Sequence, residues 1–158
     1  MRSLVVYYSR TGITKKVAES ISARMSSDIE VVVDKTDRSG PKVYFSGGRD
    51  AITKKLTEIQ APAKDPSDYD IVILGTPVWA LTMAPAIRSY IAKNKDRFRK
   101  VAFFATQGGG GRQNKFEDME ELCGKKPEAL LDLKSGEVKK EIYEARLGEF
   151  IEMLRNAR

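Results

Sequence analysis

A short segment near the amino terminus carries the side chains best suited to hold a phosphate group. It reads Ser9-Arg10-Thr11-Gly12-Ile13-Thr14 and lies between an apolar run and the start of a helical pattern. Its three hydroxyls donate hydrogen bonds, Gly12 permits an unusual φ, and the unpaired N–H groups at a helix N-terminus attract anions. The segment therefore predicts a phosphate site that needs no lysine. The alternative is that Thr11 or Thr14 only caps the helix.

Two later segments share with the first a lack of acidic side chains. Residues 75–83 contain Trp79, the only tryptophan, and residues 106–112 contain four consecutive glycines. Each segment follows an apolar run, so all three are expected at the carboxyl ends of neighbouring strands in a parallel sheet. Because 22 of the 158 residues are acidic, three acid-free loops at one edge favour an anionic ligand.

The residue types exclude several kinds of chemistry. The chain has no histidine, which excludes imidazole bases and histidine-ligated metals. Cys123 is the only cysteine, so an internal disulfide, a CxxC pair and a cysteine-ligated iron–sulfur cluster are excluded. No GxxxxGK[ST] or GxGxxG motif is present. We therefore expect no catalytic side chain and no metal, and any redox chemistry must come from a bound cofactor.

Apolar spacing predicts the elements that position these loops. Buried strands are predicted at residues 4–8, 29–33, 71–74, 101–105 and 129–133. The helical patterns between and after them comprise Val17, Ile21 and Met25; Ile52, Leu56 and Ile59; Ile87, Tyr90 and Ile91; Phe116, Met119 and Cys123; and Leu147, Phe150, Ile151 and Leu154. This alternation predicts one α/β domain over residues 1–158, a three-layer sandwich with a five-stranded parallel sheet and helices on both faces. We expect the strand order 2-1-3-4-5, in which the first and third strands are neighbours.

The chain resembles short-chain flavodoxins over nearly its whole length, in the order and spacing of its elements. Two of its loops resemble the cofactor loops of that family. Ser9, Thr11, Gly12 and Thr14 match the family's S/T-x-T-G-x-T phosphate loop, and residues 75–80 resemble the loop that lies along the flavin ring. The resemblance implies a flavodoxin-like fold with FMN as the cofactor. The cofactor-binding residues it implies are Ser9, Arg10, Thr11, Gly12, Ile13, Thr14, Thr76, Pro77, Val78, Trp79, Ala80, Thr106, Gln107, Gly108, Gly109 and Gly110.

The ring site departs from the electron-carrier pattern in one respect. Many flavodoxins place a tyrosine over the outer face of the ring, whereas residues 106–111 offer only small residues beyond Gln107. We expect an open outer face unless the long connection at residues 34–50 covers it. The alternatives are that this connection forms a partner surface or, as we favour, that it buries against the second helix. Trp79 is expected to stack on the ring or shield its edge, and the alternative is that it closes the core beneath the third helix.

The resemblance implies an FMN-binding redox protein that transfers electrons between a reductase and an acceptor. The alternative is an FMN-dependent NAD(P)H oxidoreductase acting on a quinone or similar acceptor, and a third possibility is a scaffold that has lost FMN. The partner would be a redox protein, or NAD(P)H and a quinone.

The net charge is +6, from 28 basic and 22 acidic residues, but the basic residues are interleaved with acids, so no nucleic-acid partner is expected. The apolar run at residues 4–8 is too short for a membrane span. We expect a cytoplasmic monomer or weak dimer.

Overall fold

The computed structural model describes residues 1–36, 54–109 and 113–157 of the chain. Strands and helices alternate along most of these residues, as the apolar spacing predicts. In chain order the elements are β1 (Ser3–Tyr7), α1 (Ile13–Met25), β2 (Asp28–Val31), η1 (Pro66–Asp68), β3 (Ile71–Trp79), β4 (Thr82–Met83), α3 (Pro85–Asn94), η2 (Lys95–Arg97), β5 (Lys100–Gln107), α4 (Lys115–Cys123), β6 (Leu130–Lys134), α5 (Ser135–Lys139) and α6 (Glu144–Asn156). The elements η1 and η2 are single turns of 3-10 helix.

Five parallel strands pair in the order β2-β1-β3-β5-β6. Counted along the chain, this is the predicted order 2-1-3-4-5. The sequence did not predict β4, a two-residue strand that pairs antiparallel with the end of β3. The flavodoxin-like α/β fold is thus confirmed, with a small hairpin added at the carboxyl edge of the sheet.

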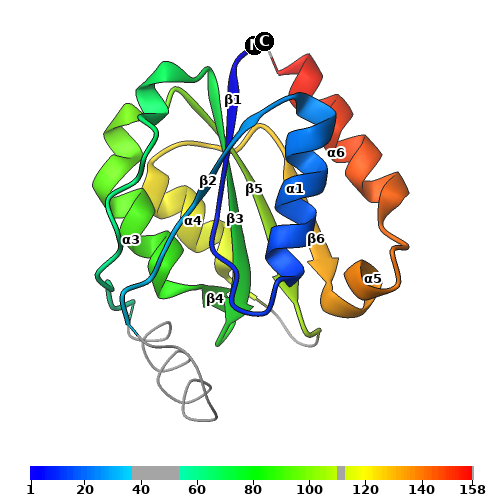
Figure 1. Ribbon diagram of the computed structural model, residues 1–158, viewed down its shortest axis with the longest axis horizontal. Coiled ribbons are helices and arrows are strands. Elements are labelled where there is room, and N and C mark those ends of the chain that lie inside the picture. Colours follow the sequence, from blue (N-terminus) through cyan, green and yellow to red (C-terminus); the bar gives the residue numbers. More distant parts are fainter. Residues whose placement is uncertain (37–53, 110–112, 158) are drawn as a thin grey trace.

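Helices cover both faces of the sheet and make three layers (Figure 1). Helices α3 and α4 lie on one side, and α1 and α6 lie on the other. Successive residues of a strand point to opposite faces, so β1 contributes Leu4 and Val6 to one buried cluster and Val5 and Tyr7 to the other. Burial on both faces explains why β1, β3 and β5 appear in the sequence as continuous apolar runs, whereas the outer strands β2 and β6 each include exposed and acidic positions.

The predicted second helix is wrong where the structure describes it. Leu56 and Ile59 lie outside any helix, and Ile52 lies outside the described residues. Instead, Ile59 forms an antiparallel bridge with Asp34, and the Gln60 N–H donates to the Val33 carbonyl at 2.9 Å. The three-residue spacing between Leu56 and Ile59 fits a helix. In the structure, however, Ile59 is buried because this segment pairs with the residues that follow β2.

The two ends of the sheet differ in character. Both chain ends lie at the amino edge of the strands, whereas α1 starts and the β3–β4 hairpin turns at the carboxyl edge (Figure 1).

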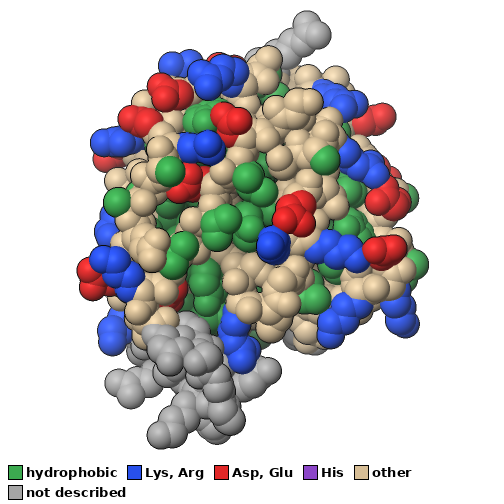
Figure 2. All heavy atoms as spheres, viewed as in Figure 1, with side chains coloured by type: hydrophobic (Ala, Val, Ile, Leu, Met, Phe, Trp, Pro, Cys, Tyr) green, Lys and Arg blue, Asp and Glu red, His purple; other side chains and the backbone are tan. Residues whose placement is uncertain are grey.

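Lys and Arg side chains on the face seen in Figure 2 are interleaved with Asp and Glu. Cys123 is packed in α4, as its helical spacing predicts, and burial raises the pKa of its thiol to about 12. Among the described helices, none is long and apolar enough to cross a membrane.

Candidate cofactor site

The first loop forms an open cradle before α1. Gly12 precedes the helix with φ 91°, in the left-handed region, and its N–H donates to Ser9 Oγ at 3.0 Å. Because Ser9 Oγ accepts this bond, its hydroxyl hydrogen is free to point toward an anion. No side chain caps α1, which contradicts the alternative that Thr11 or Thr14 serves only as a cap. The N–H groups of the first helical turn are therefore available at the positive end of the dipole.

The remaining residues of this loop divide into outward and inward side chains. Thr11 is exposed and Arg10 is half-buried. Ile13 is half-buried and packs against the core cluster on the α1 side. Thr14 is buried, and its Oγ1 lies 2.8 Å from Thr106 Oγ1. This bond ties the first loop to the end of β5, and it confirms that the first and third segments meet at one edge.

The second segment is more regular than predicted. We expected strand β3 to end at Leu74, but it continues to Trp79 because its pairing with β5 extends to Pro77 opposite Thr106. Thr76 is fully buried, and its hydroxyl donates to the Pro77 carbonyl and accepts the Ala84 N–H. A cofactor would therefore meet the backbone of Thr76 rather than its side chain.

Trp79 stands at the tip of the β3–β4 hairpin. Its ring packs edge-on against Tyr8, with centroids 5.6 Å apart and planes 86° apart. The Trp79 side chain is half-buried and also packs against the core cluster on the α3 side. Val78, paired with Met83, is half-buried as well. The structure thus leaves part of this apolar wall exposed, and it adds Tyr8, which sequence analysis placed only in a strand.

The hairpin turn has an unusual backbone. Trp79 pairs with Thr82, and the two residues between them, Ala80 and Leu81, have φ 48° and 72°. Positive φ at both positions matches a two-residue primed turn, which normally carries Gly, Asn or Asp. Neither residue of this turn has a side chain that favours that conformation, so the hairpin stores backbone strain.

Relief of this strain is testable with Ala80→Gly. We expect the free energy of unfolding to rise by about 0.5–1 kcal/mol, because the relief of left-handed strain exceeds the entropy lost with the extra freedom of glycine. Urea denaturation measures the change. The matched control is Ala23→Gly in α1, where φ is helical; it should cost about 1 kcal/mol. A loss of stability in Ala80→Gly would show that the turn is unstrained.

The third segment places two exposed glycines beside the hairpin edge. Strand β5 runs to Gln107, and a Cβ built on Gly108 or Gly109 would meet no atom within 4 Å. Gly109 has φ 103°, which an ordinary residue rarely adopts. Gly110, also predicted to bind the cofactor, lies outside the described residues, as does most of the connection at residues 34–50.

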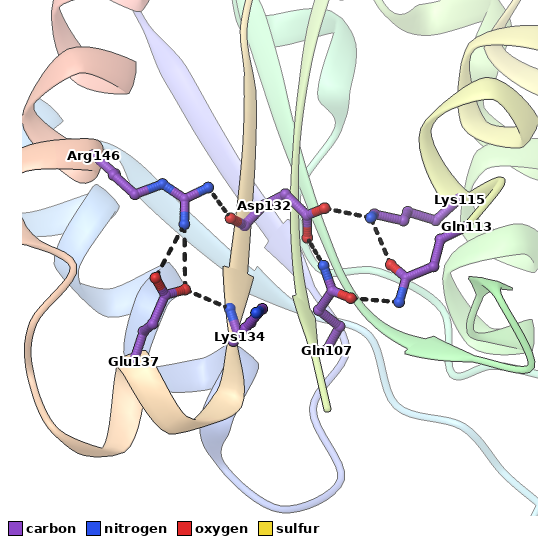
Figure 3. Close-up of polar contacts among 7 residues, drawn as sticks. All are labelled: Gln107, Gln113, Lys115, Asp132, Lys134, Glu137 and Arg146. Atoms are coloured by element: carbon purple, nitrogen blue, oxygen red, sulfur yellow. Dashed lines mark hydrogen bonds and ion pairs between the residues drawn. The ribbon is translucent and has the colours of Figure 1, made fainter. Parts of the chain in front are cut away.

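A polar network that sequence analysis missed lies behind this third segment (Figure 3). Lys115 Nζ lies 2.5 Å from Asp132 Oδ2 and donates to Gln113 Oε1 at 2.6 Å. Gln107 Nε2 donates to Asp132 Oδ1 at 2.8 Å, and Gln113 Nε2 donates to Gln107 Oε1. We call these four residues the Lys115 network. Its one sequence signal is a polar residue, Asp132, within an apolar strand run.

The described residues fit a phosphorylated flavin. Gly12, Gly108 and Gly109 are exposed, with open space where a side chain would be. They follow β1 and β5 at the edge of the sheet where α1 starts uncapped and the neighbouring strand β3 ends at Trp79. The helix start and hydroxyls suit a phosphate, and the aromatic wall beside backbone amides suits a flat ring with a polar edge. The described residues hold no cluster of acids or cysteine able to bind a metal.

A doubly wound sheet with a mononucleotide cradle after its first strand defines the class of flavodoxin-like flavoproteins. A family model described as flavodoxin matches residues 2–153. The chain therefore belongs to the flavodoxin family.

Solved structures agree with this membership. A flavoprotein from Lactobacillus acidophilus NCFM, crystallised in complex with FMN, is 27% identical, with a TM-score of 0.73 over 88% of this chain and 97% of that chain. The apo form of the flavoprotein from the same organism, solved by NMR, is 26% identical, with a TM-score of 0.64 over 88% and 95%. Oxidised flavodoxin 2 from Bacillus cereus is 16% identical, with a TM-score of 0.58 over 100% of both chains, and shows likeness of fold alone.

Proposed function

We propose that this protein binds FMN and carries electrons between a reductase and an acceptor. The observation that carries the proposal is the carboxyl edge of the sheet, where three neighbouring parallel strands lead to the uncapped start of α1 after Gly12, to Trp79 and to the exposed Gly108 and Gly109. Family membership and the FMN-bound relative support FMN as the cofactor. Bound FMN supplies the redox chemistry, and the protein supplies binding and orientation.

The chain's own residues divide this work. Backbone N–H groups at the start of α1, with the hydroxyls of Ser9 and Thr11, bind the phosphate. The Thr14–Thr106 bond fixes the distance between this cradle and the ring-lining loops. Trp79 excludes water from one side of the ring, and the backbone of residues 107–109 faces its polar edge. None of these roles requires a side chain to transfer a proton.

A second candidate function has a specific observation in its favour. Gly108 and Gly109 are exposed and carry no side chain over the ring. An open ring face could admit a nicotinamide, so the protein could take hydride from NAD(P)H and reduce a quinone. In that case no separate reductase would be required.

A steady-state assay separates the two functions. We expect the FMN-loaded protein to oxidise NADH or NADPH with benzoquinone no faster than free FMN does. When NADPH and a ferredoxin–NADP⁺ reductase are supplied as the donor system, reduction of cytochrome c should rise in proportion to the concentration of the protein. Rapid NAD(P)H oxidation without the reductase would instead establish the oxidoreductase.

A further inference from the structure

We propose that the start of α4 positions both loops that line the flavin ring, with Lys115 and Asp118 as the positioning residues. This inference rests on the FMN site of the proposed function and deepens it. Helix α4 begins at Lys115, which bonds to Gln113 and Asp132, the two partners of Gln107. On the other side, Asn114 and Asp118 bond to the β3–β4 hairpin. One helix start therefore holds two segments that are far apart in the sequence.

On the third-loop side, the Lys115 network fixes Gln107. Lys115 is 5% exposed, and its ammonium is compensated by Asp132 and by the amide oxygen of Gln113. The same carboxylate and amide hold the side chain of Gln107, which points toward Asp132 and Gln113 (Figure 3). Gly108 and Gly109 follow directly and have no side chains of their own to hold them. Their position is therefore set by Gln107.

On the hairpin side, α4 holds the strained turn. The N–H of Asn114 donates to the Leu81 carbonyl at 2.7 Å, and Thr82 Oγ1 donates to Asp118 Oδ2. Thr82 Oγ1 also accepts from Arg88 Nη2 at 3.3 Å. A turn with positive φ at two ordinary residues persists only where surrounding contacts hold it. These bonds supply such contacts beside Trp79.

The position of these loops bears on the redox state of the cofactor. Reduction adds negative charge to the flavin, so backbone donors aimed at the ring bind reduced FMN more strongly than oxidised FMN. If the loops move outward, the reduced state loses more binding energy than the oxidised state. The reduction potential then falls, whereas a general loss of stability would weaken both states equally and leave it unchanged.

The test compares dissociation constants of oxidised and reduced FMN with the two-electron potential. Lys115→Gln/Asp132→Asn removes both charges of the network, so neither is left buried and unpaired. Thr82→Val removes the hydroxyl on the hairpin side. For each, we expect the dissociation constant of reduced FMN to rise at least fivefold more than that of oxidised FMN, which lowers the potential by about 20 mV. Lys115→Arg, which keeps the charge, should retain most of the original potential.

Two further variants keep the outcome decisive. Tyr69→Phe removes a part-buried hydrogen bond to Asp28 in the amino half of the sheet and should leave the potential unchanged. If the double variant does not fold, Gln113→Ala tests the same side with the ion pair intact. Equal weakening of both redox states in all folded variants would overturn the inference. Direct NAD(P)H oxidation by the unaltered protein would reject the carrier function alone, whereas absence of FMN binding would reject both.

Discussion

Thr11→Asp is expected to weaken FMN binding by at least 100-fold. Thr11 is exposed and adjacent to the Gly12 cradle, so the new carboxylate would stand beside the phosphate group. A phosphate monoester carries a charge near −2 at pH 7. At a separation of about 5 Å and an effective dielectric constant of about 40, the repulsion is about 3 kcal/mol. Each 1.4 kcal/mol is about a tenfold change in affinity. Quenching of FMN fluorescence on titration measures it.

Thr11→Asn is the matched control for this prediction. Asparagine has nearly the size of aspartate but no charge, so its affinity should stay within about tenfold of the original protein. Neither change touches buried atoms, and the free energy of unfolding of the FMN-free protein should move by less than about 0.5 kcal/mol. Equal affinity in the two variants would mean that the phosphate does not lie at this loop.

The three central strands β1, β3 and β5 were predictable from sequence because they are buried on both faces. Continuous apolar runs such as residues 71–74 stand out from amphipathic helices, and the order 2-1-3-4-5 is the one that the resemblance to flavodoxins implies. The β3–β4 hairpin was not predictable, because Ala80 and Leu81 carry none of the usual turn signals. The prediction of a second helix was wrong because Leu56 and Ile59 have helical spacing, yet Ile59 forms an antiparallel bridge with Asp34, beyond the end of β2.

The site was predictable where its chemistry depends on local sequence. The hydroxyl-rich loop around Gly12 forms the open helix start that its pattern indicates. The Lys115 network was not predictable, since Asp132 lies 17 residues beyond Lys115 and the two meet only when β6 packs beside β5. Thr76 was predicted to bind cofactor, yet its hydroxyl is used within the fold. Sequence gives the residue types at an edge, whereas the direction of each side chain depends on tertiary packing.

Gly75→Ala is expected to lower the free energy of unfolding by about 3 kcal/mol. Gly75 on β3 lies directly opposite Phe104 on β5, and a Cβ at Gly75 would stand 1.9 Å from Phe104 Cζ. The Phe104 ring is fully buried, so it cannot move aside without displacing its neighbours in the core. Sequence analysis placed Gly75 at the start of the second acid-free loop, whereas the structure shows that it lies within β3 and provides room for an aromatic ring. Urea denaturation of the FMN-free protein measures the loss.

Gly148→Ala in α6 provides the same substitution without the clash. A Cβ at Gly148 would meet no atom within 4 Å, so this change should stabilise the protein by about 0.5–1 kcal/mol. The cause of the Gly75 effect is tested by adding Phe104→Leu, which shortens the opposing side chain. Relief of the overlap should make Gly75→Ala at least 1 kcal/mol less costly in that background than in the original protein. An additive double variant would show that the backbone freedom of Gly75, rather than the space it leaves for Phe104, is what β3 requires.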